Sequence, residues 1–548
     1  MEDKKEFSKI EYEEMKLGKR LVGVLYLDSK IKYGLHKGKI MYLFKPSSEK
    51  YPYFMVASKY ENENVKKYAY IEYVEWDEKS KYPRGNVLDY LGNVGSEEGE
   101  YNHLKYMCEL NEYKECKIEK AKIEKDIQKN KELNAFEYHV FSIDPIGCKD
   151  IDDAFHYEYD VINNEHRVGV HISYVWEYFV EEKDKYFDIF SKRVSTFYGN
   201  KKNIDMIPQE YSTNIGSFIE RNYKHSLSII YTIRNNEIIK YEIKKCIVYV
   251  SKNYDYESVN KWFLSNKEDL SKNQSIMYDL NEISKRVFLD YDGKDSHKLV
   301  EYWMIQANCT MANECVKRFG KKTILRIQEE NRKKENKNME EELSNFLEYY
   351  RGNNAIYSLY NENINNKHYQ IGKVIRNAEN YYTHYTSPIR RFCDMYIHGL
   401  FTNTLPIYVN EEYLENMVIK MNDISKRMRK YQNMSTIIQF ILNTMKSDYV
   451  NETYGYIIEL GEDMYRMYFP EYKFILKDSY RSKKYDVHLD TIYDEEEEQV
   501  IVKSNVYNDN QELYFEKIYK LYRKYRVRLY VFPKKPMIYE RILFEIIS

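Results

Sequence analysis

Alternating apolar and polar positions predict short strands near both ends of the chain. The segment 17–93 contains RLVGVLYL, YPYFMVAS and YAYIEYVEW, separated by Gly, Pro, Lys and Asn. From about residue 453 the chain returns to short strands, in YGYIIEL, YKFILK, YDVHL, EQVIVK and RVRLYVF. An OB-like barrel is the commonest nucleic-acid-binding form of such a pattern, although many other small β domains share it. We therefore expect a small β-barrel domain on each side of a central region.

The central region mixes strands and helices. YHVFSID predicts a strand that ends at Pro145, AFHYEY predicts a second strand after a short acidic loop, and VGVHISYVWEYF predicts a third strand followed by a helix. A helical period of apolar positions dominates 299–319 and 410–447, and a polar stretch at 329–342 predicts a loop. The predicted fold is a multidomain α+β protein with four parts: an OB-like cold-shock barrel (17–95), a charged helical linker (96–137), a central α/β domain (138–447) and a C-terminal OB-like barrel (453–548).

Composition agrees with several domains and narrows the classes of function. A chain of 548 residues is too long to form a single hydrophobic core, because a domain typically has roughly 100–200 residues. Lys and Arg total 85 against 87 Asp and Glu, so a nucleic-acid site must be a local channel rather than a basic surface. The charged start is unlike a signal peptide, and the sequence has no long apolar run, so we expect no membrane partner. Its seven cysteines include no Cys-x-x-Cys pair, which is typical of an intracellular protein, cytoplasmic or nuclear.

The most informative segment is an acidic loop, FSIDPIGCKDIDDAF (141–155). It brings four carboxylates close together in the sequence: Asp144, Asp150, Asp152 and Asp153. Crowded carboxylates repel one another, and a hard divalent cation with oxygen ligands, Mg²⁺ or Mn²⁺, relieves that repulsion. The alternative is an acidic turn exposed to water, since Asp is common in turns. The loop alone leaves both interpretations open.

A second segment, YYTHYTSPIRRFCDMYIH (381–398), combines a helix start with cations. Pro388 predicts the first turn of a helix, whose free N–H groups attract anions. Arg390 and Arg391 can grip a phosphate through two nitrogens each. Asp394 and His398 are spaced to pair on one helical face. The alternative is a capped helix that carries a surface Arg pair.

Together the two segments resemble the ribonuclease II (RNB) family. That family carries a strand ending in Ile-Asp-Pro followed by Asp-x-Asp-Asp-Ala, here SIDPIGCKDIDDA, and the motif His-(Phe/Tyr)-Thr-Ser-Pro-Ile-Arg-Arg, here HYTSPIRRFCDM. Weaker similarities lie between them in VGVHISYV, STFYGNKKNIDMIP, YKHSLSIIYTI and LVEYWMIQAN. WDEKSKYPRGNVLDYLGNVG (76–95) is similar to the family's second cold-shock domain, and the tail to its C-terminal OB domain. We identify no similarity to an N-terminal endonuclease domain or a first cold-shock domain.

The resemblance implies a monomeric 3′–5′ exoribonuclease that threads single-stranded RNA with a free 3′ end into a narrow channel. Two Mg²⁺ ions, with Mn²⁺ as a substitute, would be held by Asp144, Asp150, Asp152 and Asp153, and products would be nucleoside 5′-monophosphates. Arg390 would hold the reacting phosphate. The implied RNA-binding residues are Tyr198, which would stack on a base near the 3′ end, Tyr256, which would clamp the last nucleotide, and His384, Thr386, Ser387 and Arg391.

Some positions depart from the family's pattern. They are Tyr174 in place of Asp, Asp205 in place of Pro, Tyr302 in place of Glu, Lys224 in place of Arg and Gly399 in place of Arg. An aromatic loop before residue 299 is also shortened. Two other functions stay open: a catalytically inactive RNA-binding subunit with the same channel, and a DNA nuclease on the same scaffold.

Overall fold

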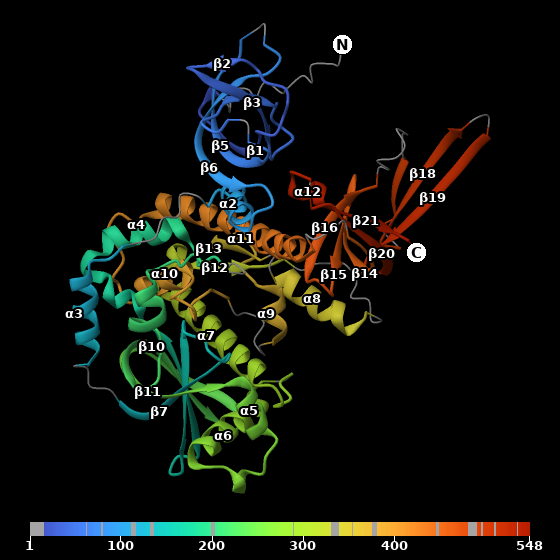
Figure 1. Ribbon diagram of the computed structural model, residues 1–548. Helices are drawn as coiled ribbons and strands as arrows, with labels where there is room; N and C mark the ends of the chain where they lie inside the picture. Colours follow the sequence, from blue (N-terminus) through green and yellow to red (C-terminus); the bar gives the residue numbers. More distant parts are fainter. Residues whose placement is uncertain are drawn as a thin grey trace.

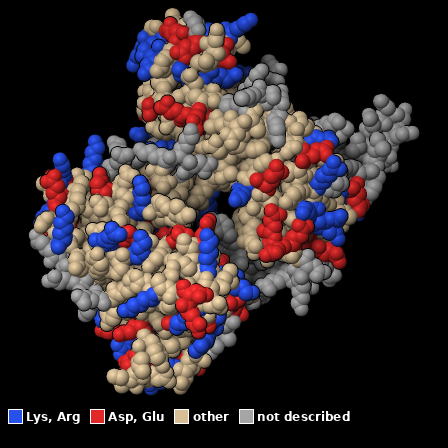
Figure 2. All heavy atoms as spheres, turned by 60° about the horizontal axis from the view of Figure 1, so that its bottom comes forward, with Lys and Arg blue, Asp and Glu red and all other residues tan. Residues whose placement is uncertain are grey.

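Three bodies make up the computed structural model of the chain (Figure 1). The structure describes residues 16–61, 63–77, 80–110, 117–131, 136–198, 203–288, 290–329, 339–352, 355–374, 381–444, 449–480, 490–494, 497–508, 511–533 and 535–547. An N-terminal β domain and a C-terminal β domain lie beside a larger central domain. Figure 2 shows acidic and basic side chains interspersed on one face, with a hollow where the central and C-terminal bodies meet. In the described part of the chain, no helix has the length and apolar character needed to cross a bilayer.

The N-terminal domain is a six-stranded sheet that curls on itself, because β1 pairs with both β3 and β5. Alternate side chains point inward, and Leu25, Phe44, Phe54 and Ile71 form the core of the domain. The strands are β1 (Arg20–Tyr26), β2 (Leu35–His36), β3 (Lys39–Pro46), β4 (Phe54–Ala57), β5 (Lys66–Glu75) and β6 (Arg84–Asn93). Helix α2 (Glu97–Met107) follows, capped by the Ser96 hydroxyl, which accepts from the Gly99 N–H.

The central domain is built around a closed barrel with the strand order β10-β11-β7-β8-β9. Its strands are β7 (Phe136–Asp144), β8 (Asp153–Asp160), β9 (Glu165–Ser173), β10 (Asn222–Arg234) and β11 (Glu237–Asp255). The β11–β7 pairing is parallel, whereas the others are antiparallel. The strands predicted in YHVFSID and AFHYEY are therefore present, and the first ends at Asp144 as predicted.

The rest of the central domain consists of helices and a small two-stranded sheet. They are α3 (Lys120–Lys131), α4 (Lys183–Arg193), α5 (Tyr256–Phe263), α6 (Lys272–Val287), α7 (Ser296–Phe319), α8 (Glu341–Gly352), α9 (Tyr369–Val374), α10 (Phe392–Phe401) and α11 (Glu411–Thr444), with strands β12 (Ile324–Ile327) and β13 (Ile356–Leu359). The two segments with the strongest helical period thus form α7 and α11. Most of the polar stretch predicted as a loop lies outside the described residues, and its end belongs to α8.

The C-terminal domain contains two antiparallel sheets. One has the order β16-β15-β14-β20-β21 and the other the order β17-β18-β19. The elements are β14 (Tyr449–Leu460), β15 (Met464–Phe469), β16 (Phe474–Ser479), β17 (Asp490–Asp494), β18 (Gln499–Asn508), β19 (Gln511–Lys520), β20 (Lys524–Val531), α12 (Ile538–Arg541) and β21 (Ile542–Ile546). The predicted strand YDVHL lies outside the described residues.

Two predictions for the segment 381–398 were wrong. Pro388 does not open a helix: residues 388–390 form a turn, and α10 begins at Phe392 with Arg391 as its N-cap. Asp394 does not pair with His398. It accepts hydrogen bonds from the Ser387 N–H and from Arg391, while His398 Nε2 lies 2.9 Å from the Tyr385 carbonyl oxygen. The buried Asp394 carboxylate forms charge-assisted hydrogen bonds with the Arg391 guanidinium and the Ser387 N–H, and these take the place of the predicted pairing with His398.

Candidate active site

The acidic loop is fixed by backbone hydrogen bonds at the end of the barrel. β7 delivers Asp144 to the barrel rim, and Gly147, at φ 81°, allows the turn that follows. The Ser217 hydroxyl accepts from the Ile151 N–H and donates to the Lys149 carbonyl, at 3.0 and 2.7 Å. These contacts position the loop independently of any ligand.

The carboxylates of the loop take different partners. Asp152 Oδ1 accepts from the Ile389 N–H at 2.9 Å, and Asp152 Oδ2 lies 3.4 Å from Arg390 Nε. Asp150 accepts from the Tyr198 hydroxyl at 3.3 Å. Asp144 Oδ2 is buried and has no hydrogen-bond partner. The loop therefore joins the Arg390 turn, a tyrosine and an unsatisfied carboxylate oxygen in one place.

Burial and mutual repulsion disfavour the ionised forms of the carboxylates at this site. Burial raises the pKa of Asp144 to about 6, and repulsion from Asp150 adds to the effect. Burial likewise raises the pKa of Asp152 to about 7, although the Arg390 cation opposes the rise. The pKa of Asp153 is raised well above its usual value by burial and by Asp144 and Asp152. A bound cation would therefore stabilise the ionised forms of these carboxylates.

The Arg390 turn is held by an ion pair between the partly exposed Arg391 and the buried Asp394. Arg391 Nη2 lies 2.7 Å from Asp394 Oδ1, which also accepts from the Ser387 N–H at 2.7 Å. Arg390 faces the other way, toward Asp152, and donates to the Ser387 hydroxyl at 3.0 Å. Asn308 of α7 also supports this segment, because its side-chain oxygen accepts from the Tyr385 N–H at 2.8 Å. The two arginines thus have separate surroundings despite their adjacency.

Tyr198 reaches the site through a strained turn. Val194 ends α4 at φ 66° and ψ −42°, and the Ser195 N–H bonds the Arg193 carbonyl at 2.7 Å, which makes a γ-turn that is costly for a β-branched residue. Beyond it, the Thr196 N–H and the Ser195 hydroxyl both donate to the Arg390 carbonyl at 2.9 Å. The segment that carries Tyr198 is thereby bonded to the Arg390 turn.

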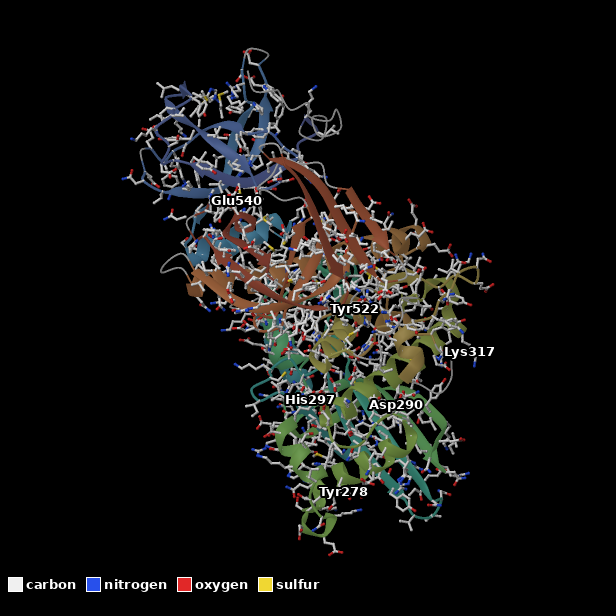
Figure 3. All side chains as sticks on the ribbon, turned by 90° about the vertical axis from the view of Figure 1, so that its right-hand side faces the viewer. Tyr278, Asp290, His297, Lys317, Tyr522 and Glu540 are labelled. Atoms are coloured by element: carbon white, nitrogen blue, oxygen red, sulfur yellow. The ribbon has the colours of Figure 1, made fainter. Side chains whose placement is uncertain are left out.

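Tyr256 reaches the site from the end of β11. The parallel pairing of β11 with β7 places Asp255 beside Asp144, and Tyr256 follows as the first residue of α5. Its ring stacks on His297, labelled in Figure 3, with centroids 3.6 Å apart and planes 11° apart. Tyr256 is therefore positioned beside the acids by strand register and by an aromatic partner that the sequence did not predict.

These groups line one cavity of about 490 Å³. All the predicted site residues line it except His384, whose Nδ1 lies 2.7 Å from the Tyr357 hydroxyl. The lining that sequence reasoning missed includes one face of α7, namely Val300, Glu301, Met304, Ile305 and Asn308, together with Pro145, Cys148, Ile371 and Tyr382. The spacing of Glu301, Met304, Ile305 and Asn308 at three and four residues was a signal for one helical face.

The side chains do not form a closed ligand shell by themselves. Among the residues that the structure describes, no three Asp, Glu, His or Cys side chains are grouped as metal ligands. Asp150 and Asp152 instead bond protein donors, Tyr198 and the Ile389 N–H respectively. The donor chemistry nevertheless suits a hard cation, because the four carboxylates share the cavity and the buried Asp144 Oδ2 is unsatisfied.

The departures from the family pattern lie away from the cavity lining. Tyr174 is buried and lies 2.9 Å from the Thr402 hydroxyl, while a Cβ on Gly399 would come within 2.6 Å of Leu405. Lys224 donates to the Asn214 and Ile215 carbonyls, the Asp205 carbonyl accepts from Arg193, and Tyr302 packs on Phe288 and Tyr291. These residues act through packing and loop support.

Comparison with known sequences identifies two domain families in the chain. Family models match the RNB domain over residues 130–288 and 284–406 and the Dis3-like cold-shock domain 2 over residues 41–109. The human exosome complex exonuclease RRP44 is 22% identical over 79% of this chain and 52% of its own length. Ribonuclease R 2 of Lactococcus lactis is 22% identical over 58% of this chain and 56% of its own. The chain thus spans about half the length of these curated relatives.

Solved structures show the same fold. RNase R of Mycoplasma genitalium, in complex with ribose-methylated single-stranded RNA, aligns with a TM-score of 0.68 and 15% identity, covering 96% of this chain and 89% of the other. Yeast Ssd1, a pseudonuclease, aligns with a TM-score of 0.62 and 13% identity, covering 97% and 83%. Because the RNB model matches about half of the sequence and the acidic loop and Arg390 turn meet in one cavity, the chain belongs to the RNB-domain family.

Proposed function

We propose that the chain is a Mg²⁺-dependent hydrolytic exoribonuclease that degrades single-stranded RNA from its 3′ end and releases nucleoside 5′-monophosphates. One observation carries the proposal: four carboxylates, Arg390 and two tyrosines from distant parts of the chain line the same cavity. The RRP44 and RNase R relatives in the RNB family support this chemistry. We further propose that RNA is the physiological polymer, since the Mycoplasma RNase R of similar fold binds single-stranded RNA.

The residues fit the parts of a phosphodiester hydrolase. Asp144, Asp150, Asp152 and Asp153 would hold the metal, with the unsatisfied Asp144 Oδ2 as one ligand atom. Bound Mg²⁺ supplies a nucleophilic water and stabilises the leaving oxygen. Arg390 is partly exposed in the cavity and can contact the phosphoryl oxygens, where charge grows in the transition state. Rings of Tyr198 and Tyr256 can stack on bases.

The decisive experiment uses purified protein with RNA of defined ends. A 3′-labelled single strand with Mg²⁺ should yield labelled mononucleotide from the first turnover, and chelation by EDTA should stop the reaction. A circular RNA of the same sequence should persist, since it has no 3′ end. Cutting of the circle at the same rate would refute exonuclease action.

The fold similarity to a pseudonuclease motivates a second candidate, an RNA-binding protein without catalysis. It predicts tight binding of single-stranded RNA and no mononucleotide with Mg²⁺ or Mn²⁺. A DNA strand of equal length, added as a competitor, tests the choice of polymer in the same assay. Degradation of DNA at the rate of RNA would favour the DNA nuclease.

A further inference from the structure

An arginine of the central domain is buried beside the candidate active site without an anionic partner. Arg326 lies on β12 and is 8% exposed. Its backbone N–H donates at 2.7 Å to the carbonyl of Tyr382, which lines the active-site cavity. Within the described part of the chain, its guanidinium forms no hydrogen bond and no ion pair. None of its nitrogens is fully buried, so their donors can still meet a ligand.

The Arg326 side chain is held in place by the strand opposite. Arg326 and Tyr357 are paired in the β12–β13 register, and the guanidinium carbon lies 4.5 Å from the centre of the Tyr357 ring. Asn422 of α11 accepts from the Tyr357 N–H and donates to its carbonyl, each at 2.8 Å. The Tyr357 hydroxyl lies 2.7 Å from His384 Nδ1. The ring beneath the cation is therefore fixed by α11 and by the segment that leads to Arg390.

The surroundings leave the charge of Arg326 uncompensated. Asp394 is already paired with Arg391. Burial lowers the pKa of His384 well below its usual value, and the Arg391 and Arg326 cations add to the effect. Burial and Arg326 likewise lower the pKa of His368 to about 4, so both imidazoles are neutral near pH 7. A cation–π contact offsets part of the cost of burying a cation, but an unpaired buried charge is strongly unfavourable. The site therefore calls for an anion.

We propose that Arg326 binds a phosphate of the RNA backbone other than the reacting one, and so anchors the strand whose 3′ end occupies the active site. The inference rests on the proposed exoribonuclease function. A guanidinium holds a phosphate through two parallel hydrogen bonds. Arg326 does not line the cavity that contains Arg390 and the four aspartates but lies next to Tyr382 at its wall. Its phosphate therefore belongs to a different nucleotide from the one that Arg390 contacts.

The test pairs one change in the protein with one change in the RNA. The ligand is a 2′-O-methyl RNA single strand in which one phosphate at a time is replaced by an uncharged methylphosphonate. The proteins are the wild type, Arg326→Gln and a control, Arg318→Gln, each as the full chain. Arg318 also lies over an aromatic ring, 4.7 Å from the centre of Phe401, but it is half-exposed and lies 3.0 Å from Glu314. Filter binding with EDTA present measures Kd, and thermal denaturation confirms folding.

Arg326→Gln should weaken binding of the all-phosphate strand about tenfold, as for a lost hydrogen bond to a charged group. The slope of log Kd against log salt should decrease by about one. Neutralising one particular phosphate should weaken wild-type binding by the same factor and leave Arg326→Gln unaffected, because the contact is already lost. Arg326→Lys should retain part of the affinity and part of the sensitivity to that phosphate. Arg318→Gln should bind every strand as the wild type does.

Two results would overturn the inference. One is an equal loss for the wild type and Arg326→Gln at every neutralised phosphate, and the other is a Kd for Arg326→Gln equal to that of Arg318→Gln. If Arg326→Gln does not fold, Arg326→Lys decides: full wild-type sensitivity at every phosphate would overturn the inference. A wild-type protein that shows the coupling but releases no mononucleotide from an unmodified strand with Mg²⁺ would refute the proposed function and leave the role of Arg326 intact.

Discussion

Substituting alanine for Arg390 and for Arg391 should separate a role in chemistry from a role in folding. Arg390 is 41% exposed in the cavity, with its Nε 3.4 Å from Asp152 Oδ2. The Arg391 side chain is 22% exposed, and its partner Asp394 is fully buried at 2.7 Å. Because α10 begins only at Phe392, the contrast arises from the turn and not from helical geometry.

The expected magnitudes follow from these surroundings. Arg391→Ala leaves the Asp394 carboxylate buried without a cation, and removal of one partner of a buried pair costs about 3–5 kcal/mol. Asp394 keeps its bond from the Ser387 N–H, so we expect about 3 kcal/mol, the lower end of that range. Arg390→Ala removes a half-exposed contact and should change stability little. Its loss should lower the rate of cleavage by about 10²–10³, as for other groups that stabilise developing charge.

Single-turnover cleavage of a short 3′-labelled RNA, filter binding and chemical denaturation measure the three effects. Arg390→Lys is the control for charge, and it should recover only part of the rate, because Lys lacks the two-pronged geometry. Asp394→Asn in the Arg391→Ala background removes the unpaired charge and should restore part of the stability. Equal, small effects of both alanine substitutions on rate and stability would refute the reasoning.

Three further predictions concern the acids, the metal and the strained turn. Asp153→Asn should keep RNA affinity in filter binding but lower cleavage by orders of magnitude, and near-normal turnover would remove Asp153 from the metal site. Burial raises the pKa of Asp144 to about 6 and of Asp152 to about 7, so the stability that they contribute is complete below about pH 4 and lost as pH rises through about 7. Without divalent ions the Tm of the protein should therefore fall between about pH 5 and pH 8, and Mg²⁺ should raise Tm more at about pH 8 than at about pH 5. An equal rise in Tm at both pH values would contradict the assignment of these two carboxylates to the metal site. Val194→Gly should be more stable than Val194→Ala by about 1 kcal/mol, the reverse of the usual order, because only Gly adopts φ 66° without strain; chemical denaturation in which Ala is the more stable would count against the strain.

The sequence predicted the parts of the site that depend on local chemistry. The alternation of apolar and polar residues before Pro145 predicted a strand that ends at Asp144, and the structure contains it. The crowding of four aspartates in the sequence predicted that their carboxylates lie close together, and they line one cavity. The start of α10 did not follow, because Pro388 suits a first helical turn and also an isolated turn. The isolated turn is favoured here because the buried Asp394 accepts hydrogen bonds from both the Ser387 N–H and Arg391.

The rest of the site depends on contacts between distant segments, which no local pattern encodes. The stacking of His297 on Tyr256 requires α7 to begin beside α5. His384 lies in a motif with cavity-lining residues on both sides, yet it bonds Tyr357 of β13. The direction of a side chain in a turn is set by tertiary packing, and that information enters only with the fold.

The parallel pairing of β11 with β7 fixes the position of Tyr256 at the end of the barrel that carries the acidic loop. The pairing places Asp255 beside Asp144, so strand register, and not the length of the connecting chain, sets the separation of Tyr256 from the acids. The β8–β9 hairpin turns back at the opposite end, where Val161 and Ile162 are 78% and 94% exposed. A peptide tag or fluorophore-binding segment placed between Ile162 and Asn163 would thus give the protein a handle for surface attachment and single-molecule observation, at the end of the barrel away from the acidic loop.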